Sequence, residues 1–168
     1  RIFATVYKNN SPLYHLYIPV QFTFFLLIYH YLYSNGKHRR VYIFSIATFW
    51  LAAVFNLMFF QNIKRFPSNT ILISCCILIV MSLFQFKKML SEVEQKSIFR
   101  QSSFWLNTGV LLFFTSTFLY WGTYNYLIRH HIRTAPISII NYYINMLFYI
   151  ILGIGLLLNK KNQETSYG

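Results

Sequence analysis

The sequence predicts an all-α integral membrane protein, a bundle of five transmembrane helices, on three observations. Five stretches of roughly twenty mostly apolar residues contain no Asp or Glu, and a helix of that length rises about 30 Å, the thickness of a bilayer's hydrocarbon core. The 168-residue chain is 56% hydrophobic and only 11% charged, whereas soluble domains average about 25% charged residues. Most of the basic residues lie between the stretches rather than inside them. The stretches are 14–33, 41–61, 71–86, 104–127 and 137–158.

We interpret residues 1–168 as a single transmembrane domain, because no internal repeat or low-complexity segment separates two parts of the chain. Residues 1–12 are too short and too polar to cross a bilayer. The first residue is Arg rather than Met. We therefore leave open that one or two helices precede it, which would make this chain part of a protein with six or seven helices.

Proline marks the starts of three of the expected helices, where its missing N–H is tolerated. These prolines are Pro12, Pro19, Pro67 and Pro136. Asn35-Gly36 predicts a turn after the first stretch. The linker 87–103 is the longest between stretches, and we expect it to form a short interfacial helix.

Small and polar residues recur at helical spacing on the four later stretches, and such residues predict the faces by which membrane helices pack. The first stretch is interrupted mainly by Gln21, so we expect it at the periphery with one face engaged. The predicted packing positions are Ser45, Thr48, Ala52 and Asn56; Ser74, Leu78, Ser82 and Gln85; Thr108, Thr115 and Gly122; Asn141, Asn145, Tyr149, Gly153 and Gly155.

The basic residues between the stretches are unevenly divided between the two sides of the membrane. Cytoplasmic loops carry the excess of Lys and Arg, so the richer side and the C-terminus are predicted to be cytoplasmic. The richer side carries Lys37, Arg39, Arg40, Lys87, Lys88, Lys96, Arg100, Lys160 and Lys161, and the other Lys64, Arg65, Arg129 and Arg133.

Polar side chains inside a bilayer are costly and point to function by default. Most of those in this chain fall in the outer half of the predicted bundle. If they face one another they form a pocket for a small neutral or anionic molecule, a lipid headgroup or a peptide. The alternative is that the amides only bond helix to helix. The candidate ligand-binding residues are Gln21, Asn56, Gln61, Trp121, Asn125, Asn141 and Asn145.

No catalytic residue, metal site or cofactor is predicted. The chain has no HExxH, GxSxG or phosphate-cradling glycine loop, and no stretch contains a carboxylate for acid–base chemistry. His15 and His30 lie on one stretch, and no other stretch offers a histidine to share a haem. The net charge of +12 does not indicate nucleic-acid binding, because the cations form short clusters between the stretches.

Three segments carry a resemblance: NNSPLYHLYIPVQFTFFLLIY, FNLMFFQNIKRFPSNT and SSFWLNTGVLLFF. Together they resemble uncharacterised bacterial multi-pass membrane proteins associated with sensor histidine kinases. The resemblance favours a sensory or scaffolding module in a bacterial inner membrane. Amides gather at the outer helix ends and charged loops on the inner side, so we expect a non-catalytic module that contacts the lipid bilayer and a cytoplasmic signalling partner or other membrane subunits. From the residues alone, a small-solute transporter and an accessory subunit of a larger membrane complex remain alternatives.

Overall fold

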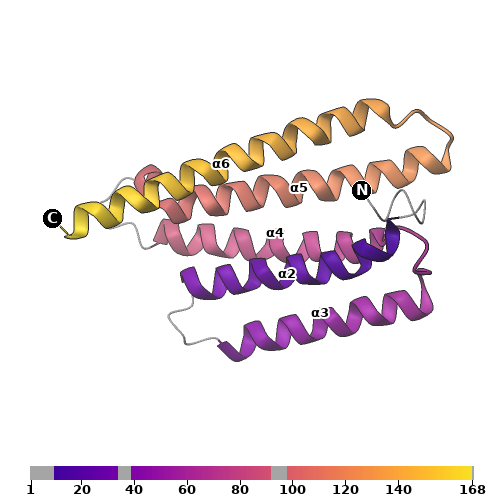
Figure 1. Cartoon of the computed structure of the whole chain (residues 1–168), viewed down its shortest axis with the longest axis horizontal. Coiled ribbons are helices and arrows are strands. Elements are labelled where there is room, and N and C mark those ends of the chain that lie inside the picture. Colours follow the sequence, from indigo (N-terminus) through magenta and orange to yellow (C-terminus); the bar gives the residue numbers. More distant parts are fainter. Residues whose placement is uncertain (1–9, 34–38, 92–97, 168) are drawn as a thin grey trace. The chain divides into compact units, whose positions relative to one another are not determined.

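The computed structural model describes residues 10–33, 39–91 and 98–167, which form helices and the turns between them (Figure 1). The long helices of this part of the chain are α2 (Ser11–Tyr33), α3 (Arg39–Phe59), α4 (Ser68–Ser91), α5 (Ser102–Arg129) and α6 (Ala135–Tyr167). A short 3₁₀ helix, η1 (Ile98–Arg100), precedes α5. The prediction of an all-α protein with five long helices is therefore confirmed for the described residues. The expected Asn35-Gly36 turn lies outside them, as does the middle of the 87–103 linker.

Four of these helices are long and apolar enough to cross a membrane: Ser11–Tyr31, Arg40–Phe59, Ser68–Ser91 and Ala135–Asn159. The chain is accordingly a multi-pass membrane protein in contact with the lipid bilayer. α5 is long enough, but Ser, Thr and Asn along its length lower its hydropathy, so the span at 104–127 stays a prediction.

The chain divides into two compact units, Arg1–Ser74 and Cys75–Gly168, with the boundary inside α4. The first unit contains α2, α3 and the first two turns of α4, and the second contains the rest of α4 with η1, α5 and α6. Each unit is described by itself below.

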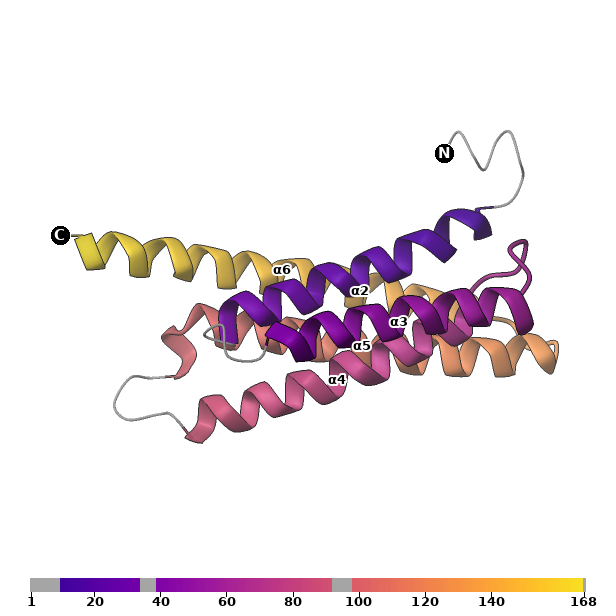
Figure 2. The same ribbon diagram turned by 90° about the horizontal axis from the view of Figure 1, so that it is seen from below.

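In the first unit, α2 and α3 lie antiparallel and side by side (Figures 1 and 2). α2 buries one stripe of side chains at spacings of three and four residues, as a helix with one engaged face does. The stripe consists of Ile18, Phe22, Leu26 and Tyr29. Phe22 stacks on Phe49 of α3 with ring centroids 3.9 Å apart. The expectation of one engaged face for this helix is confirmed.

Pro19 lies inside α2 rather than near its start, because the helix begins at Ser11 instead of residue 14. Proline has no N–H to donate to the carbonyl four residues earlier, which weakens a helix at that point. In the next turn, Thr23 Oγ1 donates to the Pro19 carbonyl at 2.8 Å and accepts from Trp50 Nε1 of α3 at 3.1 Å. A hydrogen bond thus joins the two helices one turn after the proline.

In the second unit, α5 and α6 run antiparallel along each other (Figure 1). Ser102 Oγ, at the start of α5, donates to the Gly155 carbonyl of α6 at 2.6 Å. Two glycines allow this approach: a Cβ built at Gly109 meets Ile151 Cγ2 at 3.1 Å, and one built at Gly155 meets Leu106 at 3.2 Å. Glycine therefore sets the packing distance between these helices, as in other membrane helix pairs.

The predicted packing faces hold for α4 and fail for α5. Ser74, Leu78 and Ser82 are buried. On α5 the buried side is formed by Asn107, Gly109, Val110 and Phe114, instead of the predicted Thr108, Thr115 and Gly122. On α6 the predicted Tyr149 is 67% exposed and its neighbour Phe148 is buried, stacked on Phe113. The spacing of small and polar residues does not predict the packing face here, because large apolar side chains make up most of the α5–α6 contact.

α6 continues to Tyr167, beyond the predicted end at residue 158. The segment after residue 158 is polar and contains no Pro or Gly before Gly168, so nothing in it terminates a helix. Hydrophobicity thus predicts where the apolar part ends but not where the helix ends.

A glycine pair on the two helices tests the α5–α6 contact. We expect Gly109→Ala to be about 1 kcal/mol less stable than Gly153→Ala, because both gain helix propensity but only the first meets a neighbour. A Cβ at Gly153 has nothing within 4 Å. Loss of helicity on SDS titration, followed by circular dichroism, measures the difference. Equal stability of the two variants contradicts the close approach.

Candidate functional site

The first unit contains a hydrogen-bonded group of polar side chains where α3 ends and α4 begins. We call it the amide cluster, and it consists of Asn56, Gln61, Ser68, Asn69 and Thr70. Asn56 Nδ2 donates to Gln61 Oε1 at 2.9 Å and to Thr70 Oγ1 at 3.1 Å. Its Oδ1 accepts from Asn69 Nδ2 at 3.3 Å, and Gln61 Nε2 donates to Ser68 Oγ at 3.1 Å.

The end of α3 is what brings these residues together. The Asn56 carbonyl accepts from the backbone N–H groups of both Phe60 (3.0 Å) and Gln61 (2.8 Å), so the last turn widens and the helix ends at Phe59. The helix therefore ends two residues before the approximate end of the predicted stretch 41–61, and Gln61 follows it. Leaving the helix lets the Gln61 side chain turn back to Asn56 and to the start of α4.

Asn56 is 6% exposed, and each of its amide atoms has a bond within the cluster. A buried amide with all its atoms paired stabilises the contact between its two helices. α2 also reaches this end of the unit: a ring nitrogen of His15 (Nε2) lies 2.9 Å from the Arg65 carbonyl, and Tyr14 packs on Phe66 with ring centroids 4.8 Å apart. The 60–67 loop is thus held by all three helices of the first unit.

Two hollows flank the amide cluster. The larger one, which we call the α3–α4 hollow, has a volume of about 470 Å³. Its lining is apolar except for two amides, and consists of Ala52, Phe55, Asn56, Phe60, Asn69, Leu72 and Ile73. The second, which we call the loop hollow, has a volume of about 390 Å³ and is lined by residues 57–63. Phe60 lines both hollows, so the apolar α3–α4 hollow and the loop hollow adjoin at this side chain.

Gln21, the remaining candidate of the first unit, is half-buried on α2, and the described residues give it no hydrogen bond. Four candidates lie in the second unit: Trp121, Asn125, Asn141 and Asn145. The structure therefore brings Asn56 and Gln61 together and divides the other candidates between the units. A single pocket that joins all seven stays a prediction.

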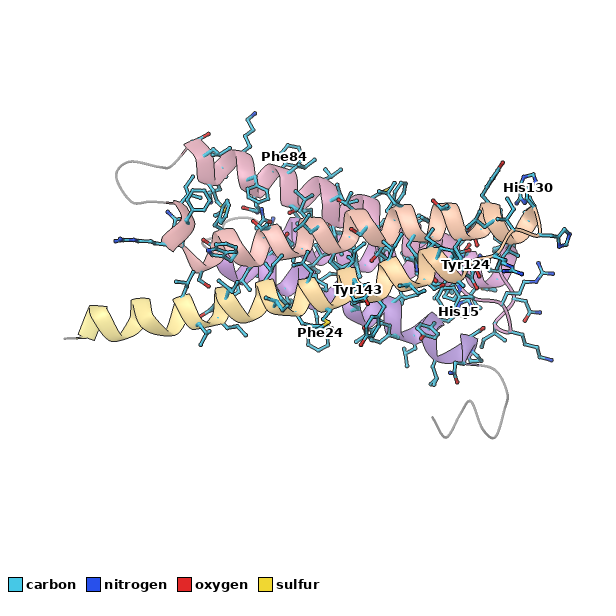
Figure 3. The ribbon with its side chains drawn as sticks, turned by 90° about the horizontal axis from the view of Figure 1, so that it is seen from above. His15, Phe24, Phe84, Tyr124, His130 and Tyr143 are labelled. Carbon is cyan, nitrogen blue, oxygen red and sulfur yellow. The ribbon has the colours of Figure 1, made fainter. Side chains whose placement is uncertain are left out.

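In the second unit, Asn141 lines a hollow of about 170 Å³ between α5 and α6, opposite Tyr120 and Thr123. Asn145 Nδ2 donates to the Asn141 carbonyl at 2.7 Å, a bond within its own helix. Trp121 packs edge to face against Tyr120 and Tyr124, and Asn125 is exposed. Figure 3 shows Tyr124 and His130 toward the end of α5 that leads to α6, with Tyr143 on α6.

Three members of the amide cluster were not predicted: Ser68, Asn69 and Thr70. Their signal is the run Ser-Asn-Thr directly after Pro67, which places three polar side chains on the first turn of α4. Asn56 and Gln61 lie before the loop and this run lies after it, so the sequence alone does not indicate which of these side chains meet.

A second polar contact is buried between α4 and α5, and we call it the Ser82–Asn107 clamp. Ser82 Oγ donates to Asn107 Oδ1 at 2.9 Å, and Asn107 Nδ2 donates to the Ser82 carbonyl at 3.0 Å. Ser82 is 0% exposed and Asn107 is 1% exposed. One turn along α4, the side-chain oxygen of Gln85 is buried and has no hydrogen-bond partner within the described part of the chain. Phe84, on the other side of this turn, projects outward (Figure 3).

Among the residues that the structure describes, no three His, Cys, Asp or Glu side chains gather as a metal ion requires. The absence of a metal, a cofactor or a catalytic residue stays a prediction. Comparison with protein-family models, with curated proteins and with solved structures finds no match for this chain.

Proposed function

We propose that this chain is a non-catalytic membrane module that binds a small amphipathic molecule or a lipid where α3 ends and α4 begins. The observation that carries the proposal is the amide cluster with its two adjoining hollows. Asn56 and Asn69 line the α3–α4 hollow and also bond each other, so the walls are held in place before a ligand arrives. Such preorganisation lowers the entropic cost of binding.

The same residues provide a route by which binding changes the module. The cluster joins α3 to the first turn of α4, and α4 is one continuous helix from Ser68 to Ser91. Thr70 and Ser82 are separated along this helix by about 18 Å. A shift of the first turn therefore moves the residue that α4 contributes to the Ser82–Asn107 clamp. This coupling supports a sensory or scaffolding role, as does the resemblance to proteins associated with sensor histidine kinases.

Three further features belong to the proposal. α5 forms a fifth span, since it packs along α6 and contacts α4 through a buried hydrogen bond, as helices in the interior of a membrane bundle do. The C-terminus is cytoplasmic, which follows from the distribution of the basic residues. A cytoplasmic signalling partner then contacts the charged end of α6 or the linker after α4.

The two alternative functions, a small-solute transporter and an accessory subunit, are not equally supported. A transporter requires a water-accessible path through both leaflets, but the polar side chain of Asn107 is buried and its amide is bonded to Ser82. An accessory subunit is favoured by α6, where Ile139, Tyr142, Tyr143 and Met146 are all more than half exposed. A partner helix covering this side of α6 is compatible with ligand binding in the first unit.

Filling the α3–α4 hollow tests the proposal. We expect the wild-type protein, purified in mild detergent, to retain a molecule from its membrane that native mass spectrometry detects. Ala52→Phe places a ring in the hollow and should reduce the retained fraction at least tenfold. Ala47→Phe adds the same ring to another exposed position of α3, outside the hollow, and should retain the molecule. Equal retention by both variants, or none by the wild type, contradicts the proposal.

A further inference from the structure

The α3–α4 hollow and the loop hollow together have the polarity of a lipid molecule. The apolar wall reaches from Ala52 of α3 to Phe60, the residue after the end of this helix, and eight steps at the helical rise span about 12 Å. One leaflet contributes about 15 Å of hydrocarbon to the bilayer. The apolar part is therefore long enough for most of one acyl chain, and Phe60 also lines the loop hollow.

The 60–67 loop lies at the depth in the bilayer where the polar end of a lipid molecule lies. The loop connects two helices that are each long and apolar enough to cross the membrane, Arg40–Phe59 and Ser68–Ser91. A short loop between two such spans lies at the level of the headgroups. Phe55 and Phe60 are more than half exposed beside the hollow, as side chains that contact lipid are.

Charge at the loop favours an anionic headgroup. Residues 1–74, the first unit, contain no Asp or Glu, so the unit has only positive formal charge. Lys64 and Arg65 are exposed in the loop, and the same residue, Asn62, fixes the backbone at both positions. Asn62 Oδ1 accepts from the Lys64 N–H at 3.0 Å and the Asn62 carbonyl accepts from the Arg65 N–H at 2.8 Å. Asn62 also lines the loop hollow, and Lys64 and Arg65 follow its last lining residue, Ile63, directly in the sequence.

We propose that the ligand of this site is an anionic phospholipid, with one acyl chain in the α3–α4 hollow and the net negative charge of its polar end at Lys64 and Arg65. The inference rests on the proposed function, because it names the class of molecule that the same site binds. Charge–charge attraction between a positively charged loop at headgroup level and an anionic lipid acts at either surface of a bilayer. The hollow adds the apolar contact that holds one lipid in a defined position.

The test uses the full chain, delipidated in detergent and titrated with phosphatidylglycerol or with phosphatidylcholine of the same acyl chains, with bound lipid measured by native mass spectrometry. We expect phosphatidylglycerol to bind at least tenfold more tightly. The double variant Lys64→Gln/Arg65→Gln should weaken phosphatidylglycerol about 10- to 30-fold and phosphatidylcholine less than about threefold, because the choline cation of phosphatidylcholine offsets its phosphate charge. The matched control Arg129→Gln/Arg133→Gln removes two exposed cations near the α5–α6 turn and should change neither lipid.

The outcomes separate this inference from the function on which it rests. If both lipids bind equally and Ala52→Phe abolishes both, the anionic preference is overturned while ligand binding in the hollow stands. If the two double variants weaken phosphatidylglycerol equally, the cations act through overall charge and the assigned position is wrong. If Ala52→Phe weakens neither lipid but still removes the molecule retained from the membrane, the ligand is not a phospholipid. If it does neither, the proposed function fails as well.

Discussion

Replacing Asn56 by Leu is expected to destabilise the protein by about 2–3 kcal/mol, the largest effect among the substitutions considered. The change removes three hydrogen bonds of the amide cluster, to Gln61, Thr70 and Asn69. Each such bond in a membrane protein contributes about 0.6–1.7 kcal/mol. Thr70 is buried, so its hydroxyl is left without the Asn56 amide and without access to water, which adds to the cost.

SDS titration followed by circular dichroism measures this loss. Asn125→Leu is the control, because it makes the same chemical change at an exposed asparagine to which the described residues give no bond. We expect it to change the free energy of unfolding by less than about 0.5 kcal/mol. The Asn56 variant should also lose retained ligand, since Asn56 lines the α3–α4 hollow. Equal stability of the two variants shows that the amide cluster contributes nothing to the fold.

The fold class was predictable because it depends on composition and length, which the sequence displays directly. Uncharged stretches of membrane-spanning length required helices in lipid, and the structure has helices at each of them. Their ends were less predictable. α3 ends two residues early because one carbonyl, that of Asn56, accepts two backbone N–H groups. α6 extends further because its polar end contains no residue that stops a helix.

The site was predictable only by residue type. Asn56 and Gln61 were selected because amides are costly in a bilayer, and the structure places both in one cluster. Their partners on α4 depend on how α3 ends and how the 60–67 loop turns, which hydropathy does not encode. The α5 packing face was missed for a related reason. Gly109 and Asn107 lie on the buried side, and the equally spaced Thr115 and Gly122 do not.

Asn107→Leu is the second substitution with a large expected effect, a loss of about 1–2 kcal/mol in the free energy of unfolding. Leu matches Asn closely in size, so the change removes polar contacts without opening a cavity. It eliminates both side-chain bonds of the Ser82–Asn107 clamp, at 2.9 and 3.0 Å. The Ser82 hydroxyl keeps a 3.2 Å bond to the Asn107 backbone carbonyl, which limits the loss.

A double-mutant cycle with Ser82→Ala isolates the clamp from other effects of the Leu side chain. Ser82→Ala removes the hydroxyl but leaves the Ser82 carbonyl bonded to the Asn107 amide. We expect the combined variant to lose at least about 0.5 kcal/mol less than the sum of the single losses, because the Oγ to Oδ1 bond is counted in both. Strict additivity shows that the two side chains act independently. Strict additivity would also contradict the proposal that the Ser82–Asn107 clamp transmits a ligand-induced shift from α4 to α5.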